Sequence, residues 1–191
     1  FKKDAIAYAW ELLTEVYGIP VERLHVTIFL DDDDAYGFWR DIGMPEDHIH
    51  RRDEELNYWF SFPAGGSGPC GPDSEIYYDY FPERGVEGAQ LQLDEAGDPV
   101  GGVGYDDERF LEIWNLVFMQ LYQSPDGSRE DLPAQNIDTG SGLERVAAVL
   151  QGKRSVFETD IFLPILEEAA FILGVEYTGD NSSKDHPDYT V

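Results

Sequence analysis

The sequence is poor in cysteine and in positive charge, and each shortage excludes a class of protein. A single cysteine, Cys70, cannot support an internal disulfide framework, which fits a reducing compartment such as the cytoplasm. Lysine and arginine number 13 against 39 acidic residues, so the formal net charge is −26. Such a surface repels a phosphate backbone, and any RNA partner therefore needs basic surface elsewhere in a longer protein.

Long apolar runs and an initiator methionine are also missing. No apolar run approaches the roughly 18 residues of a membrane span, so no membrane partner is expected. Phe1 opens directly onto a helical pattern without a signal peptide, which suggests a piece of a longer protein. The acidic residues are spread evenly rather than gathered in a tail, and adaptation to high salt is a second interpretation because lysines number only four.

Three segments carry apolar residues at helical spacing. These segments are 3–17, 143–151 and 162–173, and each ends at a glycine. Four aspartates at 31–34 are expected to cap a further short helix, because the spaced acids and the glycine of a calcium loop are absent. The polar tail 178–191 is expected to be a linker.

Strands are expected at 24–30, 75–80 and 110–123, with the last in the centre of the sheet. Residues 65–72 are predicted to be a Gly/Pro loop, and 82–108 a surface loop or hairpin. The element pattern predicts an α+β fold with an antiparallel sheet flanked by helices. The histidines lack the spacing of a zinc site, so no zinc is expected; they are His25, His48, His50 and His186.

The most informative stretch is 136–145, which reads Asn-Ile-Asp-Thr-Gly-Ser-Gly-Leu-Glu-Arg. Asp138 and the Gly140–Gly142 turn are expected to open a helix with Arg145 in its first turn. A helix N-terminus carries positive partial charge, so an arginine there favours an additional anion such as a phosphate. Asp138 is either a helix cap or a carboxylate for a ligand ammonium, and Arg145 either covers the surface or binds phosphate.

The apolar segment 110–123 contains polar residues that need partners if they are buried. Strand alternation predicts two sets of side chains: Glu112, Trp114 and Leu116 on one face, and Ile113, Asn115 and Val117 on the other. A ligand, Mg²⁺ or ordinary internal hydrogen bonds would each supply the partners.

Several segments together resemble the catalytic domain of the alanyl-tRNA synthetases, which are class II aminoacyl-tRNA synthetases. The similarity is collinear along nearly the whole chain and is carried by 1–6 with 9–14, 57–59, 68–72 with 74–76, 112–120, and 137–140 with 142–145. It implies that alanine and ATP give alanyl-adenylate and pyrophosphate, and that alanine then passes to the 3′ end of tRNA(Ala). The implied cofactors are ATP and Mg²⁺.

For the amino-acid end of the site, the resemblance implies that Asp138 holds the alanine ammonium. Gly140, Val117 and Trp59 would line the small pocket beside it. Because a small pocket discriminates poorly against glycine and serine, an editing domain is expected elsewhere in the longer protein.

For the ATP end, the resemblance implies that Arg145 binds the γ-phosphate, with Gly142 beside it. Glu112 would contact ATP or its Mg²⁺. The reaction needs no side-chain nucleophile, because the alanine carboxylate itself attacks the α-phosphorus.

Two residues depart from the family pattern: Ser141 replaces a usual methionine, and Asp73 replaces a usual second cysteine or similar residue. The motif 1 strand and the basic residues of motif 2 are missing, and the region that reads the tRNA is expected after Val191. Residues 1–177 would thus be the C-terminal part of a catalytic domain, with about half an active site and no activity alone. The alternatives are a non-catalytic synthetase-like binding or regulatory module and an acidic interaction domain.

Overall fold

The computed structural model describes residues 1–177, which form two compact units. The first unit is Phe1–Ser141, and the second begins at Gly142. Each unit is described by itself below. The expected linker at 178–191 and His186 lie outside the described residues.

The first unit begins with the predicted N-terminal helix, which is confirmed. Helix α1 spans Lys2–Glu11 and continues as a π-helical turn, η1, over Leu12–Val16. The predicted acidic cap is also confirmed, because the Asp32 carboxylate accepts a hydrogen bond from the Ala35 N–H at 3.1 Å and helix α2 runs from Asp33 to Asp41. A buried ion pair between Lys2 and Asp32, at 2.7 Å, joins the starts of these two helices.

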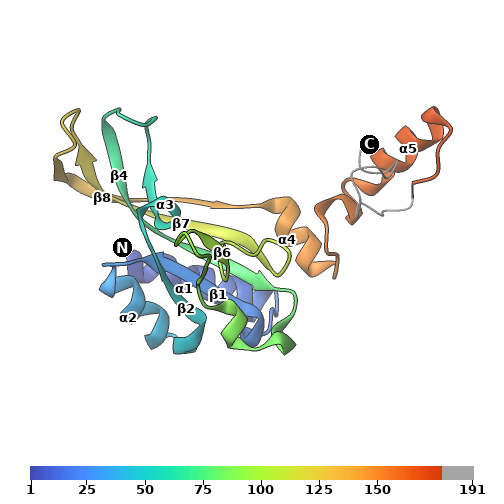
Figure 1. Ribbon diagram of the computed structural model, residues 1–191, viewed down its shortest axis with the longest axis horizontal. Coiled ribbons are helices and arrows are strands. Elements are labelled where there is room, and N and C mark those ends of the chain that lie inside the picture. Colours follow the sequence, from blue (N-terminus) through green and yellow to red (C-terminus); the bar gives the residue numbers. More distant parts are fainter. Residues whose placement is uncertain (178–191) are drawn as a thin grey trace. The chain divides into compact units, whose positions relative to one another are not determined.

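A six-stranded sheet forms the body of the first unit (Figure 1). The strand order is β2-β1-β4-β7-β8, and β3 also pairs with β4. Only β1 and β2 are parallel, so the α+β prediction is confirmed with a sheet that is mostly rather than wholly antiparallel. The strands are β1 (Leu24–Phe29), β2 (Ile49–Arg52), β3 (Tyr58–Phe60), β4 (Gly68–Asp79), β7 (Phe110–Gln123) and β8 (Arg129–Ser141).

The strand predictions were incomplete in two places. Strand β4 begins at Gly68, inside the predicted Gly/Pro loop. Strand β8, which was not predicted, continues through Asp138 and Gly140, where a helix start was expected. The glycine at position 71 serves close backbone contact rather than a turn, because a Cβ there would collide with the Phe118 carbonyl oxygen. Pairing along β7 therefore outweighs the local preference of glycine and proline for loops.

The main core lies between the sheet and the two N-terminal helices. Ile6 and Leu13 from the α1–η1 helix and Trp39 from α2 are buried together with Ile28 and Leu116 from the strands. The Trp39 indole N–H donates to the Ser74 hydroxyl at 2.9 Å, which fixes α2 against β4. In Figure 1, α1 and α2 lie together on one side of the strands.

The opposite face of the sheet is only partly covered. The segment 82–108 folds over one end of it, where Tyr77, Ala89, Val103 and Phe110 form a small buried cluster. This segment contains the predicted hairpin, so that expectation is confirmed. Its elements and the other short helices are η4 (Pro82–Arg84), η5 (Val86–Ala89), β5 (Gln92–Leu93), β6 (Pro99–Gly101), η2 (Val21–Arg23), η3 (Glu46–His48) and α3 (Glu54–Asn57).

The second unit contains the two remaining predicted helices. Helix α4 spans Leu143–Leu150, η6 spans Val156–Glu158, and α5 spans Leu163–Leu173 and ends at Gly174 with a φ of 70°. Glycine is favoured there because a left-handed residue closes the helix. Within the described residues, neither these helices nor the others are long and apolar enough to cross a membrane.

Candidate amino-acid and nucleotide site

The register of the sheet brings four of the predicted site residues onto one face. Asp73 of β4 pairs with Val117 of β7, which pairs with Asp138 of β8. Gly71, two residues before Asp73 on β4, pairs with Trp59 of β3. Residues that pair across strands point to the same side of a sheet, and residues two apart on one strand do so too.

A second row of residues lies next to the first. Glu75 of β4 pairs with Asn115 of β7, which pairs with Gly140 of β8. Gly140 therefore lies on the same face as Asp138. A Cβ added at Gly140 would meet no atom within 4 Å, so the surface beside Asp138 is open. The predicted amino-acid pocket residues are thus neighbours on a partly uncovered face.

Glu112 lies on this face as well, which corrects the predicted alternation. Trp114 pairs with Ile76, but Glu112 pairs with Tyr77, so Ile113 is an extra residue that forms a bulge. The bulge moves Glu112 from the side of Trp114 to the side of Asn115 and Val117. Strict alternation along 112–117 was therefore wrong for Glu112, and no local sequence pattern marks the extra residue.

Two acids that the site prediction missed lie in the same rows. Asp73 is only 3% exposed, and its carboxylate accepts hydrogen bonds from the side-chain amides of Asn57 at 2.9 Å and Asn115 at 3.3 Å. Burial raises the pKa of Asp73 to about 6, although both amide hydrogen bonds oppose the shift. The alternating Asp-Ser-Glu of 73–75, inside a strand, was the available signal for these acids.

Glu75 is the more strongly perturbed acid. It accepts hydrogen bonds from the Tyr77 hydroxyl at 2.5 Å and from the Asn115 amide at 3.2 Å. Burial raises the pKa of Glu75 to about 8, and the negative charges of Asp73 and Glu112 add to the effect. Near neutral pH the face therefore carries a protonated Glu75 beside a mostly ionised Asp73.

The two asparagines of this network each keep one unpaired atom. The side-chain oxygens of Asn57 and Asn115 are buried without a hydrogen-bond partner. Asn57 is fully buried and also donates to the Thr27 hydroxyl at 2.9 Å. The amide nitrogens are thus committed to the acids, and the orientation of each carboxamide is set by them.

The predicted phosphate-binding residues, Gly142 and Arg145, belong to the second unit. Gly142 is the N-cap of α4, and Arg145 is in its first turn as predicted. A Cβ at Gly142 would lie 3.2 Å from the Arg145 Cδ, so glycine leaves room for the arginine along the helix start. The capping alternative for Asp138 is wrong, because Asp138 and Gly140 belong to strand β8.

Apolar spacing over 143–151 predicts one helix face made of Leu143, Val146, Ala147 and Leu150, and this face needs a correction. Val146 is buried as expected, but Leu143 and Leu150 are exposed at 69% and 49%. Ala148 and Val149 are buried in their place.

His25, His48 and His50 form a buried cluster, in which His25 of β1 pairs with Tyr77 of β4. His25 stacks on His48 with ring centroids 3.9 Å apart, and its Nδ1 lies 3.0 Å from the His50 Nε2. Burial lowers the pKa of His50 to about 2, with help from the charge on His25. Asp79 lies 3.7 Å from His25 and forms an ion pair with Arg109 at 2.7 Å. Burial also lowers the pKa of His25, whose ring packs edge-on against Phe110.

A further question is whether side chains of the chain could together hold a metal ion. Within the described part of the chain, no group of three or more histidine, cysteine or acidic side chains is arranged to hold a metal ion. Glu112 as a contact of ATP-bound Mg²⁺ stays a prediction.

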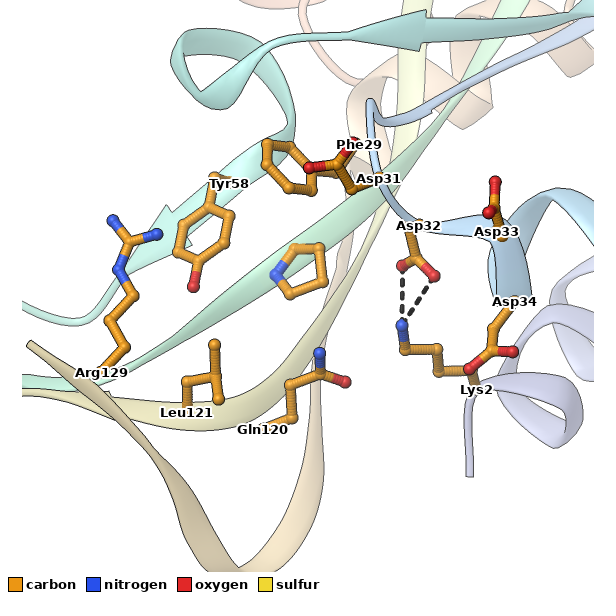
Figure 2. A pocket seen from close by; sticks show the side chains of 11 residues that line it. Lys2, Phe29, Asp31, Asp32, Asp33, Asp34, Tyr58, Gln120, Leu121 and Arg129 are labelled. Atoms are coloured by element: carbon orange, nitrogen blue, oxygen red, sulfur yellow. Dashed lines mark hydrogen bonds and ion pairs between the residues drawn. The ribbon is translucent and has the colours of Figure 1, made fainter.

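A cavity of about 450 Å³ lies on the other face of the sheet. Tyr58 and Pro72, which line it, pair across β3 and β4 and alternate with Trp59 and Asp73, so they face the helices. Figure 2 shows the ion pair of Lys2 and Asp32 at its side. None of the predicted site residues lines this cavity.

Comparisons with known proteins identify the family of this chain. The family model described as "tRNA synthetases class II (A)" matches residues 1–191. The chain belongs to this family of class II tRNA synthetases. Its relatives include an alanine–tRNA ligase of Thermosynechococcus vestitus, 51% identical over 184 residues, and one of Dehalococcoides mccartyi, 48% identical over 180 residues.

A plant relative is similar to the same extent. The chloroplastic/mitochondrial alanine–tRNA ligase of Oryza sativa subsp. indica is 48% identical over 179 residues. The matches cover 93% to 96% of this chain but only 16% to 19% of these relatives' length. The chain therefore spans less than a fifth of the curated relatives that it matches.

Proposed function

We propose that the chain is the amino-acid-binding part of an alanine–tRNA ligase. The full-length protein activates L-alanine with ATP to alanyl-adenylate and then transfers alanine to the 3′ end of tRNA(Ala). The observation that carries this proposal is the sheet register, which gathers Trp59, Val117, Asp138 and Gly140 on one face. The names of the similar proteins support the choice of alanine.

The chemistry assigns a task to the residues of each unit. The exposed Asp138 carboxylate pairs with the alanine ammonium, and Gly140 leaves space beside it. Arg145, in the first turn of α4, binds the γ-phosphate, where the helix N-terminus adds positive potential. Mg²⁺ bound to ATP would neutralise phosphate charge, and Glu112 is the residue of this chain proposed to contact it.

The reaction on these residues is mainly positioning. The alanine carboxylate oxygen attacks the α-phosphorus, a new P–O bond forms, and pyrophosphate leaves with the electron pair of the broken bond. No side chain of this chain acts as nucleophile. Trp59 and Val117 limit the space for the amino-acid side chain. Since glycine lacks only a methyl group, this limit discriminates weakly, and the full-length protein is proposed to carry an editing region.

The remaining assignments follow from the same proposal. Residues 1–177 form the C-terminal part of the catalytic domain, and tRNA is bound by regions outside this chain. The charge of −26 makes this chain itself a poor binder of RNA. The enzyme is proposed to work in the cytoplasm.

Alanine-dependent ATP–pyrophosphate exchange by the full-length protein tests this proposal. We expect exchange with alanine and at least tenfold slower exchange with leucine, whose side chain is too large for the pocket. Absence of alanine-dependent exchange would leave the alternative of a non-catalytic binding module. Calorimetry with a non-hydrolysable alanyl-adenylate analogue separates that alternative from an interaction domain, because only a binding module would release heat.

A further inference from the structure

The buried carboxylate of Asp73 connects the two walls of the amino-acid pocket. Its Oδ1 accepts the Asn57 amide at 2.9 Å, and its Oδ2 accepts the Asn115 amide at 3.3 Å. Asn57 lies two residues before Trp59, and Asn115 lies two residues before Val117. Asn115 therefore shares the sheet face of Val117, and Asn57, the last residue of α3, reaches Asp73 on the same face through its side-chain amide.

The two walls come from different elements, β3 and β7, which both pair with β4. Asn57 ends the short helix α3 and leads into β3, whereas Asn115 belongs to the long strand β7. Asp73, on β4, lies between them and pairs directly with Val117. Asp73 thus links the segment of Trp59 to the segment of Val117 through side chains, in addition to the backbone pairing of both segments with β4.

We propose that Asp73 is a positioning residue that fixes the width of the amino-acid pocket and so contributes to its selectivity for a small side chain. The proposal rests on the proposed function. The carboxylate is a suitable clamp because it accepts two charge-assisted hydrogen bonds at once. A cysteine in this position could not do so, because a thiol is a weak donor and acceptor.

The clamp also explains the two unpaired carboxamide oxygens. Each asparagine turns its nitrogen toward Asp73, and the oxygen is left buried without a partner. Leaving a buried acceptor unpaired is costly, so the orientation is kept by the stronger bonds to the carboxylate. Such an unpaired oxygen is expected where the position of the asparagine matters more than the stability that a paired oxygen would add.

The test compares amino acids of different size in the full-length protein. Asp73→Ala and Asp73→Cys remove the clamp. Asp73→Asn retains it, because Asn57 can turn its unpaired oxygen toward the new amide and accept a hydrogen bond from it. The Thr27 hydroxyl, which accepts from Asn57 in the wild type, then donates to the same oxygen. Asp107→Ala, at an exposed aspartate, is the matched control. Circular dichroism and thermal unfolding verify folding, and the cysteine variant is the second route if the alanine variant does not fold.

The measurement is kcat/KM in ATP–pyrophosphate exchange for alanine and for 2-aminobutyrate, which is one methylene larger. One methylene is worth roughly 10- to 200-fold in a fitted pocket, so we expect the alanine preference to fall about fivefold or more in the alanine and cysteine variants. The asparagine variant should stay within about threefold of the wild type. A merely structural role would lower the rate for both amino acids together.

Two results would overturn the clamp. One is a preference within twofold of the wild type in the folded variants that lack the carboxylate. The other is an asparagine variant that loses the preference as fully as the alanine variant. Both require a wild type that exchanges with alanine, and absence of that activity would count against the proposed function instead.

Discussion

The Glu75→Gln variant should be more stable than the wild type, by a margin that grows as the pH rises. Glu75 is 9% exposed, and burial together with the charges of Asp73 and Glu112 raises its pKa from 4.5 to about 8. A group whose pKa is higher in the folded state than in the unfolded state destabilises the fold as pH rises from about 4.5 through about 8. At about 1.4 kcal/mol per tenfold change, the full cost of the ionised form is roughly 5 kcal/mol.

Glutamine mimics the neutral acid and can still accept a hydrogen bond from the Tyr77 hydroxyl. The variant therefore does not carry the free-energy cost of a buried ionised group. Between pH 6 and pH 8, the stability of the wild type relative to the Glu75→Gln variant should fall by about 2 kcal/mol, or roughly 30- to 60-fold in the opening equilibrium. Glu95→Gln, at an exposed glutamate, is the control and should show no such trend.

Hydrogen–deuterium exchange of the full-length protein reads this difference locally. Peptides that cover β4 and β7 should exchange more slowly in the Glu75→Gln variant at pH 8 and nearly as in the wild type at low pH. Comparison at equal pH removes the intrinsic dependence of exchange on pH. A ratio of exchange rates that is constant from pH 6 to pH 8 would refute the assignment of a protonated Glu75.

Further predictions concern the buried ion pair and two glycines. Lys2→Met leaves the Asp32 carboxylate buried without its partner and should cost about 3–5 kcal/mol, seen as faster exchange in α1 and α2; unchanged exchange would contradict a structural role for this pair. Gly71→Ala should destabilise the sheet because its Cβ would meet the Phe118 carbonyl oxygen, and equal thermal stability to the wild type would count against this packing. Gly140→Ala has open space around the new Cβ, so it should fold normally and raise the KM for alanine by about tenfold, and an unchanged KM would remove Gly140 from the pocket.

Local patterns predicted the elements whose own sequence decides their structure. The apolar spacing of α1, the aspartate cap of α2 and the long strand β7 were found from periodicity and capping chemistry. The Ser-Pro-Asp-Gly sequence of 124–127 predicts a turn, and the Gly127 N–H donates to the Ser124 carbonyl at 2.9 Å.

The missed features depend on partners that are distant in the sequence. Strand β8 is polar and contains Pro133, so only its pairing with β7 defines it. The bulge at Ile113 is set by the register against β4 and changes the face of Glu112. The Asp73 clamp requires three elements to meet, and no spacing in one segment announces it.

The most direct test of the central claim examines the alanine and the ATP assignments separately. In the full-length protein, Asp138→Ala should raise the KM for alanine by roughly 30-fold or more, because a charge-assisted pair with the ammonium is lost. Arg145→Ala should instead raise the KM for ATP, and Asp131→Ala, at another exposed aspartate of β8, should change neither. Wild-type ATP–pyrophosphate exchange kinetics in both the Asp138 and the Arg145 variants would contradict the account.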